Sequence, residues 1–267
     1  MKAWRELERA LQGGPAVLVS VHEVQGSGPR EVGAWMAITC AGGLIGTIGG
    51  GQLEFDAIAR AHDLLDRAVP CDEVTRYALG PSLGQCCGGI VHLRFEWLEE
   101  GASGIRERLA GVEARVSVAL FGGGHVGRAI VTLLGRLPAD VFWVDSREEI
   151  FPPALPDNVS AEHSDPVQAA VRDVAPGSRV LIMSFSHAED LDIVAACLQR
   201  QRERRDLPYI GLIGSKSKWA AFRHRLETRG FTEEEIAHVT CPIGLPGITG
   251  KEPEVIAIAV VAQLLAN

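Results

Sequence analysis

The spacing of apolar residues divides the chain into two stretches with different patterns. In the first stretch, apolar and polar residues alternate along short segments, as they do in strands with one buried face. We expect strands at 15–24, 32–40, 44–48, 73–79 and 90–98, and helices at 1–12 and 51–68. Strands and helices that do not alternate regularly in this way are typical of an α+β domain.

The second stretch has continuous apolar runs separated by segments with helical spacing. Continuous runs are typical of parallel strands that are buried on both faces. We expect strands at 116–121, 141–144, near 159, 179–185 and 208–213, helices at 166–174, 187–205 and 216–229, and an apolar terminal helix around 255–265. Because strands that alternate with helices form parallel sheets, this pattern predicts a doubly wound sheet.

The two patterns predict an α/β protein with two domains. We place an N-terminal α+β domain at residues 1–100 and a Rossmann-like domain with a doubly wound parallel sheet at residues 113–267. The glycine-containing segment Glu99–Gly104, EEGASG, lies between them and has the composition of a linker.

A glycine motif supports the second domain. Gly122, Gly124 and Gly127 form G-x-G-x-x-G directly after the run 116–121 and at the start of a helical pattern. Strand, glycine turn and helix in this order are the context of the dinucleotide fingerprint. In that fingerprint the first glycine allows the turn, the second lets backbone approach a pyrophosphate, and the third lets helix and strand pack closely.

Polar residues after the next strands are candidates for ligand contacts. Asp145 ends the run 141–144, near the position of a ribose-binding acid, and the nearby Arg147 leaves room for a phosphorylated ribose. Ser186 and His187 follow a later strand, where they could contact a ligand, cap a helix or lie in solvent. Lys218 belongs to a basic helix start that is compatible with phosphate.

Two glycine-rich segments of the first domain are also candidate sites. Gly49, Gly50 and Gly51 precede a helix, where their N–H groups could bind an anion or simply turn the chain. Cys86 and Cys87 are adjacent and flanked by glycines, so their thiols would be accessible to a ligand or sulfur donor. The alternative is a tight turn with incidental thiols.

Composition excludes several classes of function. The chain has 267 residues, of which 34 are acidic and 26 basic, for a formal charge of −8. This charge argues against binding to nucleic acid or to an anionic membrane. Six cysteines without an export signal are typical of thiols in a reducing compartment, so we expect a cytoplasmic protein.

The motifs together resemble the XdhC family of xanthine dehydrogenase accessory proteins, within the wider XdhC/CoxI group. The similar segments include GSGPREVGAWM, GTIGGGQLE, LGQCCGG, FGGGHVGRA, VDSREEIFP, SFSHAEDLD, YIGLIGSKSKWAAF and PIGLPGITGKEPEV, in family order along nearly the whole chain. The resemblance makes the N-terminal domain XdhC/CoxI-like. The chain has Ala188 and Glu189 where the wider family often has histidine or aspartate, so no catalytic role is carried over to His187.

The resemblance implies a maturation chaperone rather than an enzyme. Such a protein binds molybdopterin-type molybdenum cofactor, supports its sulfuration with a cysteine desulfurase, and assists its insertion into apo xanthine dehydrogenase. No catalytic residue or metal-ligand set is assigned. The candidate cofactor-binding residues are Cys86, Cys87, Gly49, Gly50, Gly51, Gly122, Gly123, Gly124, His125, Gly127, Asp145, Arg147, Ser186 and His187.

Other functions remain compatible with the sequence. The Rossmann-like domain could bind NAD(P) or another nucleotide in an oxidoreductase, or its site could be vestigial in a docking protein. The sequence leaves open which domain holds the cofactor, whether the cysteines bind metal or relay sulfur, and whether the chain forms a homodimer.

Overall fold

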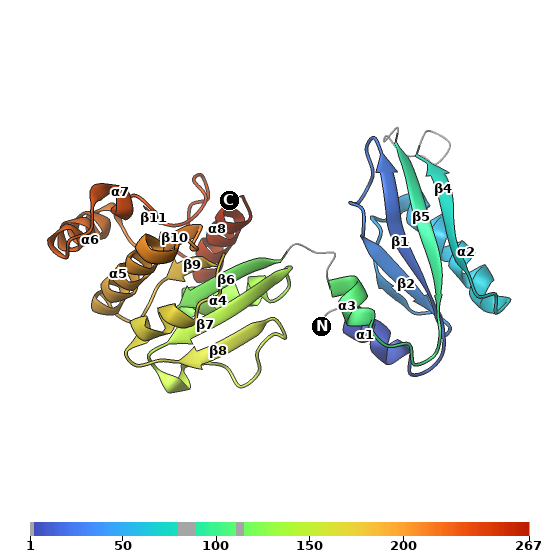
Figure 1. Cartoon of the computed structure of the whole chain (residues 1–267), viewed down its shortest axis with the longest axis horizontal. Helices are drawn as coiled ribbons and strands as arrows, with labels where there is room; N and C mark the ends of the chain where they lie inside the picture. Colours follow the sequence, from blue (N-terminus) through green and yellow to red (C-terminus); the bar gives the residue numbers. More distant parts are fainter. Residues whose placement is uncertain (1–2, 80–88, 111–114, 267) are drawn as a thin grey trace. The chain divides into compact units, whose positions relative to one another are not determined.

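A computed structural model describes residues 3–79, 89–110 and 115–266 (Figure 1). The chain divides into two compact units, residues 1–113 and 114–267. No helix among the described residues is both long and apolar enough to cross a lipid bilayer.

The first unit is built on an antiparallel five-stranded sheet with the order β3-β2-β1-β5-β4. Its strands are β1 (Ala16–Gln25), β2 (Trp35–Thr39), β3 (Leu44–Gly46), β4 (Asp72–Ala78) and β5 (Ile90–Leu98). Its helices are α1 (Ala3–Ala10), α2 (Gly51–Asp66) and α3 (Ile105–Ala110).

Alternate residues of β1 enter two separate cores on the two faces of this sheet. Val17 and Val19 pack in a cluster with Leu53 of α2, whereas Leu18 packs in a cluster with Leu7 of α1 and with α3. The period of two that predicted the strand therefore places one helix layer on each face.

The segment predicted as a linker belongs to the first unit. The N–H of Gly101 donates to the carbonyl oxygen of Leu11 at 2.8 Å, and Ala102 packs against the same core as α1. Helix α3, which the sequence pattern did not predict, packs there through Ile105 and Leu109. The first unit thus continues past residue 100, because these apolar side chains are buried in its core.

The second unit contains a parallel six-stranded sheet with the order β11-β10-β9-β6-β7-β8. Its strands are β6 (Val116–Phe121), β7 (Ala139–Asp145), β8 (Val159–His163), β9 (Arg179–Ile182), β10 (Tyr209–Leu212) and β11 (Val239–Thr240). Its α-helices are α4 (His125–Leu134), α5 (His187–Arg204), α6 (Lys216–Thr228), α7 (Glu233–Ile236) and α8 (Pro253–Ala266), and its 3₁₀ helices are η2 (Glu148–Ile150) and η3 (Val167–Asp173).

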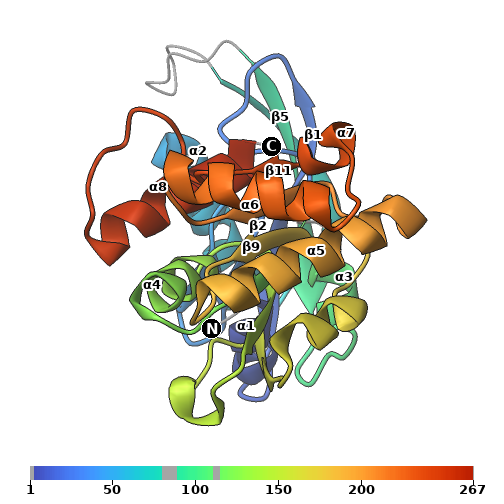
Figure 2. The ribbon, with the colours of Figure 1, turned by 90° about the vertical axis from the view of Figure 1, so that its left-hand side faces the viewer.

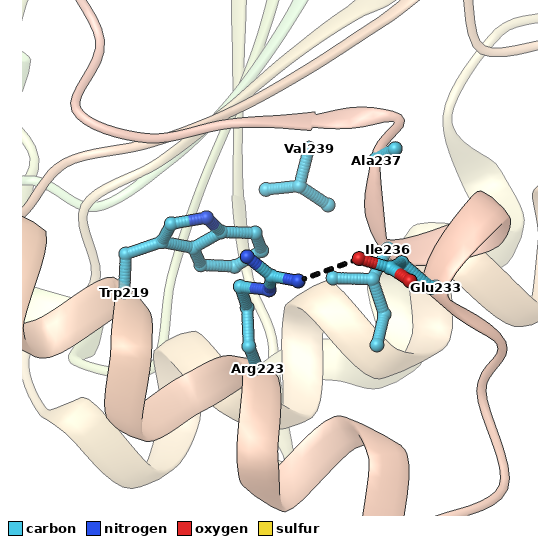
Figure 3. A pocket seen from close by; sticks show the side chains of 6 residues that line it. All are labelled: Trp219, Arg223, Glu233, Ile236, Ala237 and Val239. Atoms are coloured by element: carbon cyan, nitrogen blue, oxygen red, sulfur yellow. Dashed lines mark hydrogen bonds and ion pairs between the residues drawn. The ribbon is translucent and has the colours of Figure 1, made fainter.

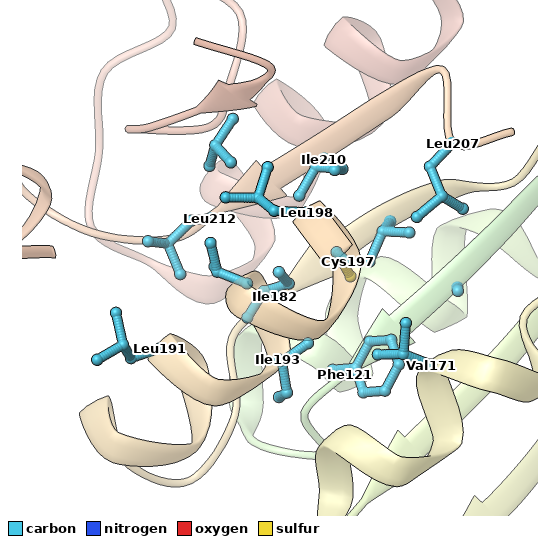
Figure 4. Close-up of a cluster of buried hydrophobic side chains, with 14 of the residues drawn as sticks. Phe121, Val171, Ile182, Leu191, Ile193, Cys197, Leu198, Leu207, Ile210 and Leu212 are labelled. Atoms are coloured by element: carbon cyan, nitrogen blue, oxygen red, sulfur yellow. The ribbon is translucent and has the colours of Figure 1, made fainter. Parts of the chain in front are cut away.

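Helices cover both faces of this sheet. Phe121 of β6 and Ile182 of β9 pack with α5, α6 and η3, and Figure 4 shows this cluster around Leu191 and Cys197 of α5. Helices α5 and α6 lie side by side on that face (Figure 2). Leu120 and its neighbours on the other face pack against α4 and α8. The predicted α/β fold with a doubly wound parallel sheet is therefore confirmed.

The strand order also locates the ligand crevice of such a fold. The chain runs from β6 outward to β7 and β8, then returns to β9 on the other side of β6. This reversal is the switch point of a Rossmann-type sheet, and ligands bind there, outside the carboxyl ends of the strands. A ligand site is therefore expected in the segments that follow β6, β7 and β9.

Candidate functional site

The turn between β6 and α4 requires glycine at its first and last motif positions. A Cβ atom on Gly122 would overlap the carbonyl oxygen of Met183, which follows β9. A Cβ atom on Gly127 would overlap the carbonyl oxygen of Gly122. These contacts bring the start of α4 close against the ends of β6 and β9, as the motif predicts.

Gly124, between these two glycines, is open to the surroundings. Within the described part of the chain, no atom lies within 4 Å of the position that its Cβ would occupy. Gly124 is the N-cap of α4, so no side chain caps the helix, and its first turn contains no acidic residue. His125 follows and is exposed. The start of α4 can therefore accept an anionic group, because its N–H groups and the helix dipole both favour negative charge.

Asp145 is buried at the end of β7 and bonds to its own chain. Its Oδ2 accepts from the N–H of Gly123 at 2.6 Å and from a guanidinium nitrogen of Arg147 at 2.9 Å. Its Oδ1 accepts from the backbone N–H and the Nε of Arg147, at 2.9 and 2.8 Å. Burial raises the pKa of Asp145, but these hydrogen bonds outweigh it and lower the pKa below its ordinary value.

Arg147 reaches from Asp145 to the segment after β9. Its Cζ lies 4.6 Å from the ring centroid of Phe185, a cation–π contact. Phe185 nevertheless keeps 67% of its surface exposed. The pair joins the ends of β7 and β9 across the crevice. Phe185 was not predicted as a site residue, although a phenylalanine between two serines after a buried strand is a detectable signal.

The structure gives Ser186 a capping role. Its hydroxyl oxygen accepts from the N–H of Glu189 at 3.2 Å and so caps α5. His187 begins the helix, is exposed, and lies edge-on to the ring of Phe222 at 6.3 Å. His187 is thus placed beside the crevice without a hydrogen-bonded partner among the described residues.

An ion pair under the crevice was not predicted. Lys218 Nζ lies 2.6 Å from Asp190 Oδ2, and their side chains are only 10% and 3% exposed. Asp190 Oδ1 accepts from the N–H and hydroxyl of Ser184, and Lys218 also donates to the carbonyl oxygen of Ile213. Lys218 is therefore neutralised inside the protein, and this network joins the carboxyl ends of β9 and β10.

The glycines at the start of α2 meet an anion that the chain itself provides. Glu54 Oε2 accepts from the N–H groups of Ile48 and Gly50, at 2.8 and 3.1 Å, and from the hydroxyl of Thr47 at 2.5 Å. Burial raises the pKa of Glu54, but these bonds lower it overall. The structure thus brings the candidate anion site at Gly49, Gly50 and Gly51 together with a carboxylate.

Cys86 and Cys87 lie outside the described residues, so their candidate role stays a prediction. The described cysteines are Cys40, Cys71, Cys197 and Cys241, all free thiols. Across 3–79, 89–110 and 115–266, no group of three or more metal-ligating histidine, cysteine or acidic side chains occurs.

A separate hollow of about 190 Å³ lies between α6 and α7, lined by Trp219, Arg223 and Glu233 among others (Figure 3). Arg223 approaches Glu233 to 3.2 Å there. None of the predicted site residues lines this hollow.

Sequence comparisons found relatives of this chain in two bacteria. It is 29% identical over 259 residues to "Uncharacterized protein YqeB" of Escherichia coli (strain K12), covering 95% of this chain and 44% of that protein. It is 34% identical over 85 residues to a probable xanthine dehydrogenase subunit from Bacillus subtilis (strain 168), covering 30% of this chain and 26% of that protein. The chain therefore spans less than half the length of these relatives.

A solved structure shows the same fold. The crystal structure of a xanthine dehydrogenase from Bacillus halodurans has a TM-score of 0.74 and 22% identity, covering 99% of this chain and 95% of that one. Residues 10–78 match the XdhC and CoxI family, and residues 118–264 match the XdhC Rossmann domain. Because the second match alone covers more than half of the chain, the chain belongs to the XdhC family.

Proposed function

We propose that this chain is a xanthine dehydrogenase accessory protein that binds a molybdopterin-type molybdenum cofactor. In this role it supports sulfuration of the cofactor with a cysteine desulfurase and assists its insertion into apo xanthine dehydrogenase. Membership of the XdhC family supports an accessory role in maturation. The observation that carries cofactor binding is the open start of α4 at Gly124.

The phosphate of such a cofactor fits this helix start. Gly124 presents no side chain, the first turn of α4 has no acid to repel an anion, and the exposed His125 follows directly. Unhindered N–H groups at a helix start form a phosphate site. Molybdenum prefers soft sulfur ligands, so a separate proposal, from the sequence alone, is that Cys86 and Cys87 bind the metal or relay sulfur.

The start of α2 is a weaker candidate for the phosphate. Glu54 already accepts hydrogen bonds from Ile48 and Gly50 there, so a bound phosphate would have to displace a carboxylate. We therefore place the cofactor phosphate in the second unit rather than at Gly49–Gly51.

The test is to load the purified protein with isolated molybdenum cofactor and compare it with the Gly124→Ala variant. The added Cβ lies in open space, so the fold should be retained while close approach of a phosphate is blocked. We expect cofactor affinity to fall about tenfold or more, which corresponds to about 1.4 kcal/mol. The matched control is Gly13→Ala in the first unit, where the added Cβ makes only an ordinary contact at 3.5 Å.

A second measurement tests the partner. Apo xanthine dehydrogenase should gain activity when mixed with the loaded protein and a desulfurase, and gain less with the Gly124→Ala variant. Equal cofactor retention in both proteins, or no activation by the wild type, would contradict the proposal. Replacing Cys86 and Cys87 by alanine would separate direct metal binding, which lowers retention, from sulfur relay, which lowers activation alone.

An NAD-dependent oxidoreductase gains no support from Asp145. The ribose-binding acid of that interpretation has both oxygens bonded to Gly123 and Arg147. The crevice therefore keeps the phosphate-binding part of the dinucleotide motif without an acid that is free to bind a ribose.

A further inference from the structure

Phe185 is an aromatic ring that the fold leaves exposed beside the phosphate-binding turn. It follows β9, the strand next to β6, and 67% of its surface is accessible. The guanidinium of Arg147 covers one face of the ring at 4.6 Å. Because so much of the ring remains accessible, its other face is open to a second planar group.

Asp145 holds Arg147 in this position and has no acceptor left for a ligand. A carboxylate offers about four lone-pair positions. Gly123 uses one of them and Arg147 uses the other three. The Asp145 side chain is only 1% exposed. Asp145 is thus a positioning residue, and a ribose diol in the crevice would find no free oxygen on it.

Glu189 supplies an unused acceptor close to this pair. Its Oε1 accepts from the hydroxyl of Ser146 at 2.8 Å. Its Oε2 is buried and has no hydrogen-bond partner among the residues described. A buried carboxylate oxygen without a donor is costly, so a rotation of the Glu189 side chain that turns this oxygen toward a donor of the ligand would be stabilising. Glu189 lies near enough to Arg147 to raise the pKa of that guanidinium.

We propose that the open face of Phe185 stacks the planar ring of the crevice ligand and that Glu189 accepts hydrogen bonds from the edge of that ring. A carboxylate pairs best with neighbouring N–H and NH₂ groups, so the ring is a 2-amino-oxo pyrimidine, the element that pterins and guanine share. The proposal rests on the proposed function for one point only, the binding of the ligand phosphate at α4.

Calorimetric titration of the full chain with GDP, 2′-deoxy-GDP and ADP tests this assignment. GDP and 2′-deoxy-GDP should bind within about twofold of each other, because Asp145 does not bind the ribose. ADP should bind about fivefold or more weakly, because its ring lacks the paired donors. Failure of GDP to bind at millimolar concentration, or a clear preference for GDP over 2′-deoxy-GDP, would overturn the proposal.

Substitutions in the crevice test where the ring of the ligand binds. Phe185→Leu should lower the affinity for GDP about fivefold or more, since stacking on an aromatic side chain contributes this much per base. Glu189→Gln should remove the preference for GDP over ADP. Phe55→Leu is the matched control, because Phe55 is as exposed as Phe185 but belongs to α2 of the first unit. Unchanged GDP affinity in Phe185→Leu would also overturn the proposal.

A double-mutant cycle tests the positioning role. If Asp145 acts through Arg147, Asp145→Asn should lower the affinity for GDP in the wild-type protein. The same substitution should cause little further loss of affinity in a protein that already carries Arg147→Gln. Additive losses would contradict this role. The cofactor and activation assays are independent of these titrations. A protein that binds GDP as expected but activates no xanthine dehydrogenase would refute the proposed function and leave the stacking site standing.

Discussion

Gly49–Gly51 in the first unit and Gly122–Gly124 in the second both connect a strand to a helix. At α2, the carboxylate of Glu54 accepts from the turn's own N–H groups. Among the described residues, neither helix has a side-chain cap, and the space beside the N-cap glycine is open at both Gly50 and Gly124. At α4, however, the first turn contains no acid, and of the turn's N–H groups the Asp145 carboxylate accepts only that of Gly123, before the helix. Similar local sequences thus give one helix start that is neutralised internally and one that is free for an external anion. The presence of glycines is therefore less informative than the acid that follows them.

The largest loss of stability should come from replacing Gly122, where the turn before α4 requires a glycine. Gly122→Ala places a Cβ against the carbonyl oxygen of Met183 at a positive φ of 130°. We expect a loss of about 3 kcal/mol in the free energy of unfolding of the second unit. Urea unfolding checks this, with Gly124→Ala as the control that should change stability by less than about 0.5 kcal/mol. Similar losses in both variants would mean that Gly124 is not open.

Removing the Glu54 carboxylate should let the turn before α2 bind an external anion, as we propose for the turn before α4. Glu54→Ala leaves the N–H groups of Ile48 and Gly50 without their acceptor, so we expect a loss of about 2 kcal/mol. Millimolar sulfate should restore part of this stability in the variant, because the vacated site accepts an anion. The control is Gln52→Ala, on the exposed side of the same helix. If sulfate stabilises the wild-type first unit equally, the site is not filled by Glu54.

Hydrogen exchange should distinguish the turns in the unaltered protein. A phosphate-bearing ligand should slow exchange of the amides at residues 124–126 at the start of α4, about tenfold at saturation. The amides of Ile48 and Gly50 should exchange at the same rate with and without ligand, because Glu54 remains their acceptor. If the ligand slowed exchange of the amides at the start of α2 instead, the anion site would lie at α2 and not at α4.

Low pH should lower the free energy of unfolding of the first unit through Glu54, by a smaller amount than the substitutions above. The pKa of Glu54 is lower in the folded protein than its ordinary value of about 4.3, so its stabilising contribution is present above that pH. The contribution is lost as the pH falls below about 4 and through the folded pKa. The free energy of unfolding of the first unit should therefore fall less steeply between pH 6 and 3 in Glu54→Gln than in the wild type. Equal slopes would show that Glu54 does not titrate in this way.

The regular architecture could be predicted from the sequence because it depends on local periodicity. Apolar spacing located most of the helices and strands, and the G-x-G-x-x-G motif located the turn at the switch point. The helices α3 and α7 and the strand β11 were missed, because segments of six, four and two residues are too short to show a period.

The polar contacts of the site could be predicted only in part. The position of Asp145 followed from the strand pattern, but its pairing with Arg147 depends on side-chain orientation. Asp190 and Lys218 are 28 residues apart, and only the packing of α5 beside α6 brings them together. Glu54 offered a local signal, since an acid in the first turn after a glycine triplet is placed to bond the turn.

The ion pair between Asp190 and Lys218 has a consequence for how this family changes over time. Replacing either partner alone leaves an uncompensated charge in a site that is at most 10% exposed, which costs about 3–5 kcal/mol. Replacing both with apolar residues removes that cost. Single replacements should therefore be purged by selection, so relatives should carry both residues or neither, and an unmatched acid or lysine at these positions should be rare.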